Sequence, residues 1–311
     1  MSRRCIGIVA ATLIVASAIS VAVPSHACEP LESDAPSVAG ETRKDSAGRA
    51  VARISINGQG PFRFIIDTGA NRSVLSRSLA ERLGLTPSGE DVVHSIVGPE
   101  SATLVHVESL SFGSLRLSQG DTPVLDGPML DGEHGLLGVD GMSGRLLHLD
   151  FDKRCVAIYE SAAQLSMKGW LSVPAQLRFG SLLLVEGEIV GVRVNVLIDT
   201  GSDISIGNER FREALRDVAA RSIEYRDGHA FTFGRPLLLE ESVWTPALRL
   251  GRTVVDGVHA YIGNFHIFDV WGLRDEPTVL IGMDVLAQSR EMAIDYQSGV
   301  VHFRKRPRGY Q

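Results

Sequence analysis

Two stretches of the chain repeat one another, and together they decide the fold. Residues 51–76 read VARISINGQGPFRFIIDTGANRSVLS, and residues 183–207 read LLVEGEIVGVRVNVLIDTGSDISIG. Each stretch contains an alternating apolar pattern, a glycine turn, a second apolar strand and the tripeptide Asp-Thr-Gly. Alternation of apolar and polar residues is typical of half-buried strands, and glycine is typical of the turns between them. The same order of elements, met twice, indicates two homologous units.

A second block recurs downstream of each repeat. Residues 136–140 read LLGVD, and residues 280–284 read LIGMD. Each block leads to a trio of an aliphatic residue, an Asp and an aromatic residue, and then to a short turn and a last strand. We therefore predict a mainly β chain of two homologous lobes, which span residues 49–163 and 169–305.

Helices are few in the predicted lobes. Residues 76–83 are predicted to form one helix, because Ser76 can cap its start and a glycine can end it. A longer helix is predicted over residues 208–221, where apolar residues recur on one face. Short helical turns are expected after Gly138 and Gly282.

The composition excludes several classes of protein. The 311 residues are 44% hydrophobic and 22% charged, which is ordinary for a globular protein and excludes a disordered chain. The formal net charge is −6, and the single basic cluster is the C-terminal stretch 304–308. An acidic chain without a basic stripe is not expected to bind nucleic acid.

The first 27 residues are interpreted as an export signal. Two arginines precede an uncharged apolar run over residues 6–23, and a cleavage site of small residues ends at Ala27. We expect an exported chain, periplasmic or secreted. An uncleaved signal would instead anchor the chain in a membrane, and Cys28 leaves a lipoprotein as a third alternative. Residues 28–48 are polar and without period, and they are interpreted as a linker.

Cysteine and histidine usage predicts neither a metal nor a cofactor. Of the three cysteines, only Cys28 and Cys155 remain after removal of a signal, and they could pair in an oxidising compartment. Two thiols provide no zinc site. The histidines are scattered and form no His-Glu-x-x-His motif, and no Gly-x-Ser-x-Gly motif supports a serine hydrolase.

The two Asp-Thr-Gly tripeptides carry the candidate chemistry. Asp67 and Asp199 each follow an apolar strand, so each carboxyl group is expected at the edge of a low-dielectric core. A single copy would be an ordinary turn. If the two lobes bring both copies together, the carboxyl groups share a proton. One could then take a proton from water while the other donates to a carbonyl oxygen, which hydrolyses a peptide bond by general acid–base catalysis.

At these motifs the chain resembles the aspartic peptidases, and it is nearer to the retropepsin-like bacterial branch than to the pepsins. The motifs that carry the resemblance are Asp67-Thr68-Gly69-Ala70, Asp199-Thr200-Gly201-Ser202, Leu137-Gly138 and Ile281-Gly282. The resemblance implies two lobes of the acid-protease double-psi β-barrel type with a few short helices. It implies a monomer with pseudo-twofold lobes that cleaves a peptide or protein substrate without a cofactor.

The same resemblance implies a role for each matching residue. Asp67 and Asp199 would be the catalytic pair, and Thr68 and Thr200 would interlock beneath them. The remaining motif residues would support the active loops or lie behind them: Gly69, Ala70, Gly201, Ser202, Leu137, Gly138, Ile281 and Gly282. A substrate cleft between the lobes would be covered by a β-hairpin flap.

The chain departs from the family pattern in its flap. The pepsin flap carries a Tyr, whereas residues 92–105 contain none. The candidate tip is the stretch 94–99, with Ile96, Val97 and Gly98 at its centre. The corresponding stretch of the second lobe, residues 225–236, could supply a second flap.

Two further interpretations concern function. Ser202 follows the second motif where Ala70 follows the first, so its hydroxyl could bond to Asp199 and favour ionisation of that carboxyl group. The leading function is an exported aspartic endopeptidase that activates a water molecule between Asp67 and Asp199. The alternative is a catalytically silent peptide-binding protein on the same scaffold.

Overall fold

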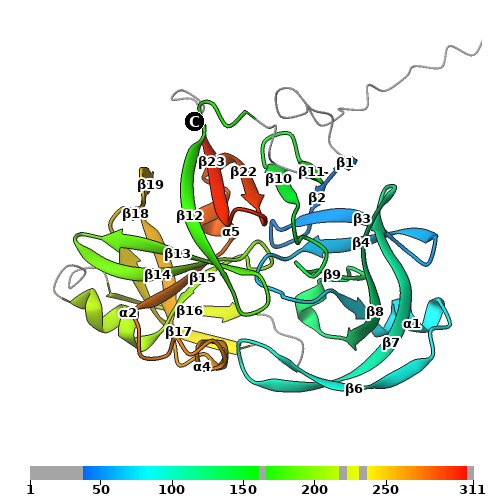
Figure 1. Ribbon diagram of the computed structural model, residues 1–311. Coiled ribbons are helices and arrows are strands. Elements are labelled where there is room, and N and C mark those ends of the chain that lie inside the picture. The colour runs from blue at the N-terminus through cyan, green and yellow to red at the C-terminus, as the bar shows by residue number, and fades with distance from the viewer. Residues whose placement is uncertain (1–37, 161–165, 217–222, 231–236, 307–311) are drawn as a thin grey trace, which may run out of the picture.

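The computed structural model describes residues 38–160, 166–216, 223–230 and 237–306 (Figure 1). The predicted signal lies outside these residues, and so do Cys28, the junction around residue 163 and the end of the predicted helix 208–221. Strands far outnumber helices in the described residues, which confirms the prediction of a mainly β chain.

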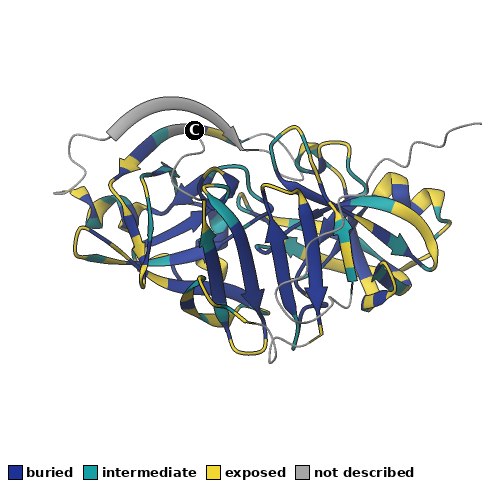
Figure 2. Ribbon diagram, turned by 90° about the horizontal axis from the view of Figure 1, so that it is seen from above, coloured by how far each residue is buried: buried dark blue, intermediate teal, exposed yellow. Residues whose placement is uncertain are grey.

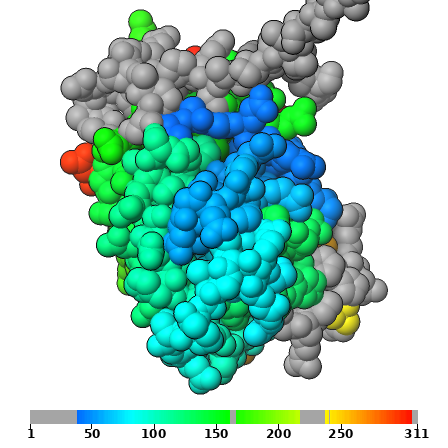
Figure 3. Space-filling model, turned by 90° about the vertical axis from the view of Figure 1, so that its right-hand side faces the viewer, coloured from blue at the N-terminus to red at the C-terminus, as the bar shows by residue number. Residues whose placement is uncertain are grey.

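The N-terminal half contains most of the strands shown in blue to green in Figure 1. They are β1 (Val38–Glu41), β2 (Arg43–Lys44), β3 (Ala50–Ile56), β4 (Gln59–Ile66), β5 (Val74–Ser76), β6 (Pro87–His94), β7 (Pro99–Phe112), β8 (Leu115–Leu125), β9 (Gly135–Leu137), β10 (Leu146–Asp150) and β11 (Cys155–Tyr159). Its helices are α1 (Arg77–Arg82) and the 3-10 turn η1 (Pro128–Leu130). Figure 3 shows this half from the side, and its residues make most of that face.

The C-terminal half repeats this composition. Its strands are β12 (Leu171–Arg178), β13 (Leu182–Ile189), β14 (Val192–Ile198), β15 (Ser205–Gly207), β16 (Ile223–Ala230), β17 (Leu237–Thr245), β18 (Leu248–Leu250), β19 (Thr253–Val255), β20 (Val258–Ile262), β21 (Thr278–Ile281), β22 (Ser289–Asp295) and β23 (Val300–Lys305). Its helices include α2 (Glu209–Ala214), α4 (His266–Val270) and α5 (Met283–Leu286).

The strand pairings around the two Asp-Thr-Gly motifs follow the same plan. In the N-terminal half, β9 pairs parallel with β4 and antiparallel with β5, and β5 pairs parallel with β8. In the C-terminal half, β21 pairs parallel with β14 and antiparallel with β15, and β15 pairs parallel with β20. The sequence repeat is therefore also a repeat of strand topology.

Burial explains why each motif follows an unbroken apolar run. The last residues of β4, Phe64–Ile66, are all buried, and so are the last residues of β14, Val196–Ile198. A strand covered on both faces has apolar residues in succession instead of in alternation. Each Asp-Thr-Gly loop therefore leaves the core directly from a fully covered strand.

The two halves meet in a shared sheet. Strand β10 pairs antiparallel with β22, so that the strand order β1-β11-β10-β22-β23-β12 runs from one half into the other. Strands β10, β11 and β22 are largely buried, and they appear dark blue between the halves in Figure 2. Across this junction His148 Nε2 lies 3.0 Å from Glu291 Oε2, with both side chains buried. Backbone pairing therefore makes the two halves one continuous structure.

The linker prediction for residues 28–48 is wrong for residues 38–48. Val38–Glu41 form β1, which pairs with β11, and Arg43–Lys44 form β2, which pairs with β3. Edge strands need only backbone hydrogen bonds and are often short and polar, so their sequence carries little periodicity. The turn that follows β2 contributes to the candidate site described below.

The helix predictions differ in outcome. Ser76 caps α1 by accepting a hydrogen bond from Leu79 N at 3.2 Å, and the helix ends before Gly84 as expected. Asn208 caps α2 in the same way, and that helix ends at Ala214, whereas residues 217–221 of the predicted helix lie outside the described residues. The helical turn expected after Gly282 is α5, whereas Gly138 is followed by a non-helical turn.

Two further observations concern Cys155 and the character of the helices. Cys155 is disulfide-bonded, and its partner lies outside the described residues. Within the ranges given above, none of the helices has the length and apolar character that a membrane crossing requires.

Candidate active site

The two Asp-Thr-Gly loops are anchored in equivalent ways. Asp67 N donates to Leu137 O at 2.9 Å, and Asp199 N donates to Ile281 O at 3.1 Å. The residues of the second repeated block therefore lie directly behind the two loops. These backbone bonds fix where each aspartate leaves its strand.

The two threonines interlock across the halves. Thr68 N donates to Thr200 Oγ1 at 3.2 Å, and Thr200 N donates to Thr68 Oγ1 at 3.0 Å. Each hydroxyl in turn donates to a backbone carbonyl of the other half, Thr68 Oγ1 to Ile198 O at 2.9 Å and Thr200 Oγ1 to Ile66 O at 2.7 Å. Both side chains are fully buried, so this reciprocal set locks one loop to the other.

The glycines allow the two carboxyl groups to approach. A Cβ atom added to Gly69 would collide with the carboxyl group of Asp199, and one added to Gly201 would collide with that of Asp67. Gly69 N donates to Asp67 Oδ1 at 2.9 Å, and Gly201 N donates to Asp199 Oδ1 at 2.8 Å. Each glycine thus binds its own aspartate and leaves space for the opposite one.

A serine and a second aspartate support each loop from behind. Ser73 Oγ donates to Asp140 Oδ1 at 2.7 Å and accepts from Gly138 N at 3.1 Å. In the other half, Ser205 Oγ donates to Asp284 Oδ1 at 2.8 Å and accepts from Gly282 N at 3.1 Å. Because Cβ atoms at Gly138 and Gly282 would collide with backbone, only glycine fits at these positions. Asp140 and Asp284, which sequence reasoning did not treat as support residues, complete both networks.

Burial raises the pKa values of the two aspartates above the ordinary value for a carboxyl group. Desolvation is the main cause that raises the pKa of both carboxyl groups. The pKa of Asp199 is raised further by the charge of Asp67, whereas bonds from Asp199 and Gly69 and the charge of Arg49 partly offset the rise at Asp67. Two carboxyl groups this close share one proton, an arrangement for which aspartic peptidases are the standard example.

The hydroxyl of Ser202 does not act as predicted. Ser202 Oγ donates to Ile204 O at 2.7 Å, which turns it away from Asp199. The prediction that this hydroxyl favours ionisation of Asp199 is therefore wrong. The donor that bonds to Asp199 Oδ1 is Gly201 N, at 2.8 Å.

The aspartates lie at the base of a cleft of about 710 Å³ that both halves line. Its polar lining near the aspartates includes Arg49, Asn71, Ser202 and Asp203. Its apolar lining includes Val92, Ile96, Met129 and Leu136 from one half, and Leu182, Ile204, Ile267 and Trp271 from the other. Such a cleft can hold an extended chain with apolar side chains on both sides of the aspartates.

The hairpin β6–β7 reaches across this cleft. Its tip is closed by Ser95 N donating to Gly98 O at 2.9 Å, and Figure 1 shows the hairpin extending toward α4. His266 N donates to Ile96 O at 2.9 Å, and the rings of His94 and His266 share a 2.9 Å hydrogen bond between Nδ1 and Nε2. The hairpin of one half is thus docked on a helix of the other.

The predicted flap residues have different surroundings. Ile96 lines the cleft, whereas Val97 is exposed and Gly98 closes the turn. The tip of the second predicted flap, residues 231–236, lies outside the described residues, although β16 and β17 pair on either side of it. The docking residue His266 was not predicted, because its role depends on a contact between the halves.

Arg49 is the main site residue that the sequence did not reveal. It lies immediately before β3, is buried, and donates to Gly201 O at 3.1 Å. Its only sequence signal is a charged residue next to a strand that is otherwise apolar. Across the part of the chain that the structure describes, no three His, Cys, Asp or Glu side chains gather as metal ligands would.

Two carboxyl groups, buried together at the base of a cleft between two β-rich halves, define an acid–base site of the two-aspartate class. Residues 52–140 match the family model described as aspartyl protease. This match supports the resemblance to the aspartic peptidases, of retropepsin-like type, that the motifs of the chain carry. No curated protein matches the chain significantly. The matched stretch contains Asp67, and the repeat that carries Asp199 lies beyond it.

Proposed function

We propose that this protein is an exported aspartic endopeptidase in which Asp67 and Asp199 act on one peptide bond. The observation that carries the proposal is the crossing of the two loops, in which each glycine makes room for the opposite carboxyl group. The repeated pairing of β9 and β21 supports two lobes of the double-psi barrel type, with boundaries near residues 49–163 and 169–305.

The proposed reaction needs only a water molecule and one shared proton. The ionised carboxylate takes a proton from water, and the water oxygen attacks the carbonyl carbon of the substrate. The protonated carboxyl group donates its proton to the carbonyl oxygen. The proton held by the first carboxylate then passes to the amide nitrogen as the C–N bond breaks. At the same time a hydroxyl group of the tetrahedral intermediate returns its proton to the second carboxylate as the C=O bond of the new carboxyl group forms, so the pair is again singly protonated.

The substrate is proposed to be an extended peptide or unfolded protein. The cleft holds apolar side chains from both halves, and the docked hairpin would lie over a bound chain. Apolar substrate residues beside the cleaved bond would fill these pockets. Export is supported by the N-terminal signal pattern and by the disulfide at Cys155, because disulfides persist in oxidising compartments. Sequencing the N-terminus of the exported product tests whether the signal is removed.

Cleavage of unfolded protein by the purified exported chain tests the proposal. The chain and its Asp67→Asn variant are incubated with an unfolded substrate from acid to neutral pH, with and without a pepstatin-type inhibitor. Asp126→Asn is the matched control, because Asp126 is exposed and pairs with Arg77 on the surface. Cleavage by the wild type and the control, but not by Asp67→Asn, supports the endopeptidase. Binding of peptide without cleavage at any pH would favour the silent peptide-binding alternative.

A further inference from the structure

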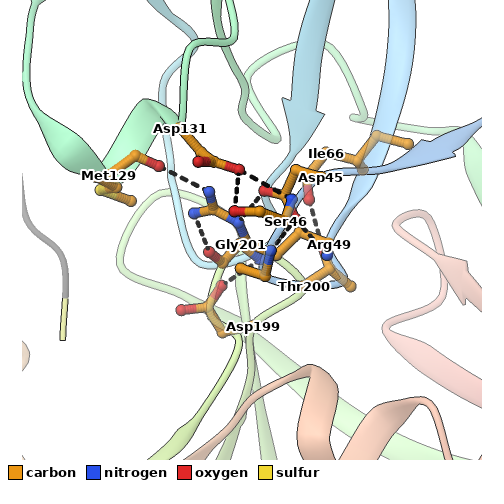
Figure 4. A network of polar contacts seen from close by, with 10 residues as sticks. Asp45, Ser46, Arg49, Ile66, Met129, Asp131, Asp199, Thr200 and Gly201 are labelled. Carbon is orange, nitrogen blue, oxygen red and sulfur yellow. Dashed lines mark hydrogen bonds and ion pairs between the residues drawn. The ribbon is translucent and has the colours of Figure 1, made fainter. Parts of the chain in front are cut away.

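Arg49 is a buried cation in which each of the three guanidinium nitrogens donates a hydrogen bond. Nε donates to Asp45 Oδ2 at 2.6 Å, Nη2 donates to Met129 O at 2.8 Å, and Nη1 donates to Gly201 O at 3.1 Å (Figure 4). The side chain is only 7% exposed. A charge buried this far needs such partners, and the partners hold it in one orientation.

One of these partners connects Arg49 to the aspartate pair. Arg49 binds the carbonyl group of Gly201, and the N–H group of the same residue donates to Asp199 Oδ1 at 2.8 Å. Arg49 therefore lies at the loop that carries Asp199, and it lines the same cleft as the two aspartates. Its charge acts on the pair through space and partly offsets the rise in the pKa of Asp67. The guanidinium also fixes the position of this loop relative to the N-terminal half.

The sequence repeat shows that this contact exists on one side only. Arg49 precedes β3 as Ser181 precedes β13, and both positions stand at the same distance before their Asp-Thr-Gly motifs. Ser181 carries no charge and cannot repeat the contact. On that side, Asn71 instead donates from Nδ2 to Phe179 O at 3.2 Å. Among the residues that the structure describes, this contact of a cation with the opposite aspartate loop therefore comes from the N-terminal half alone.

We propose that Arg49 is a positioning residue that holds the Asp199 loop across the two halves and, by its charge, keeps the aspartate pair singly ionised at lower pH. This inference rests on the proposed function. A nearby cation favours each step in which the pair loses a proton, whichever carboxyl group loses it first. Without Arg49, both steps move to higher pH.

The other charged groups around Arg49 and the pair are few. Asp45 binds Arg49 directly, and Asp131 is held by Ser46 N at 2.9 Å and by the Ser46 hydroxyl. Burial raises the pKa of Asp203, and the charge of Arg49 partly offsets that rise. Burial keeps the pKa of Tyr296 above its ordinary value, so this phenol stays neutral. Among these groups, Arg49 is the only cation.

The test compares charge with hydrogen bonding at position 49. Arg49→Gln keeps a donor but loses the charge, and Arg49→Lys keeps the charge. We expect both limbs of the kcat/KM profile to move to higher pH by about half a unit or more in Arg49→Gln. Arg49→Lys should stay near the wild type. Arg145→Gln is the matched control, because Arg145 also holds backbone carbonyls, Gly141 O and Arg116 O.

A second readout does not depend on cleavage. The two carboxyl groups are titrated by carbon NMR of labelled aspartate, assigned with Asp67→Asn and Asp199→Asn, and the same upward shift is expected in Arg49→Gln. Unmoved titrations in Arg49→Gln, or equal shifts in Arg49→Lys and Arg49→Gln, would overturn the inference even in an inactive protein. If Arg49→Gln does not fold, Asp45→Asn with Arg49→Gln replaces the buried pair by neutral amides. The carboxyl titrations of this double variant must also shift to higher pH. Asp45 binds Nε, whereas Nη1 of Arg49 binds the Asp199 loop, so loss of the Arg49 charge should dominate.

Discussion

At the scale of single residues, the aspartates are carboxyl groups that folding places in an unfavourable environment. Both are buried and adjacent, and their pKa values are raised chiefly by desolvation. Such sites are maintained because surrounding contacts determine the geometry, here the threonine interlock and the backbone bonds behind the loops. Burial of the two carboxyl groups therefore lowers the free energy of unfolding, and replacement of one carboxyl group by a neutral side chain should raise it again.

The first prediction concerns the thermal stability of Asp199→Asn. The pKa of Asp199 is raised from an ordinary value of 3.8, so its environment costs no stability below that pH and costs more as the pH rises toward the folded value. An amide removes this cost. We expect the gain in Tm of Asp199→Asn over the wild type to be small near pH 3.5 and to grow toward pH 7, as measured by calorimetry. A gain that stays constant or shrinks over this range would contradict the account.

The second prediction concerns Ser202. Its hydroxyl donates to Ile204 O and not to the carboxyl group of Asp199. Ser202→Ala should therefore lower the free energy of unfolding by about 1 kcal/mol while it leaves the acid limb of the pH–rate profile where it is. A profile measured beside the denaturation curve checks both points. A raised acid limb would show that the hydroxyl contacts the aspartate during catalysis.

At the scale of elements, the hairpin β6–β7 connects the two halves over the cleft. The backbone bond between His266 and Ile96 and the ring contact between His94 and His266 hold its tip against α4. In the proposed function, a peptide bound in the cleft lies against this hairpin, because His94 and Ile96 line the cleft. The strength of the contact should therefore affect substrate binding more than the chemical step.

The third prediction follows for His94→Ala. Loss of one hydrogen bond of about 1 kcal/mol corresponds to about a fivefold change in an equilibrium constant, so KM should rise by about that factor with kcat changed less. His106→Ala is the matched control, because His106 is exposed on β7 and contacts Asp121 at 3.4 Å. Steady-state kinetics of both variants measure whether the docking contact affects KM. An unchanged KM in His94→Ala, or the same rise in His106→Ala, would show that the docking contact plays no part in binding.

The elements also show where sequence reasoning succeeds. Strands beside the motifs could be predicted, because alternation and Asp-Thr-Gly are local signals, and Ser76 caps α1 as its type and position suggest. The strand Val38–Glu41 was missed because an edge strand needs little apolar pattern. The start of α2, like that of α1, could be predicted, because Asn208 caps it by accepting a hydrogen bond from Phe211 N.

At the scale of the whole molecule, the halves are joined by a sheet and by the buried hydrogen bond between His148 and Glu291. Burial alone would raise the pKa of Glu291, but the hydrogen bond and charge of His148, with Arg290 and Arg304, outweigh this and lower it. A carboxyl group with a lowered pKa stabilises the fold above its ordinary value of 4.5, and this contribution is lost as the pH falls through the folded value. The junction between the halves should therefore weaken in acid.

The fourth prediction is that Glu291→Gln loses stability at neutral pH but not in acid. Gln cannot offer His148 a charged acceptor, so the free energy of unfolding should fall below that of the wild type at pH 7. The difference should close as the pH falls toward 3 and the wild-type carboxyl group takes up its proton. Urea denaturation at both pH values measures the difference. Equal stability at pH 7, or a difference that widens in acid, would contradict this role of the pair.

Several contacts of the site join a residue of one half to the other half, and such contacts are difficult to predict from the sequence. Asp67, Asp199 and their threonines could be predicted because the chain contains the motif twice. Arg49 and His266 could not, since each acts on the opposite half and neither belongs to a repeated pattern. Contacts across a pseudo-twofold axis leave no period along the chain. They become visible only when both halves are assembled.

The central claim is that Asp67 and Asp199 form one catalytic unit. Its most direct test is kcat/KM for Asp67→Asn, Asp199→Asn and the double variant on one unfolded protein substrate. Residues that act as a unit are strongly non-additive. We predict that each single variant loses activity by about a hundredfold to ten-thousandfold, and that the double variant is no worse than either. Near-wild-type activity in either single variant, or losses that multiply in the double variant, would contradict the claim.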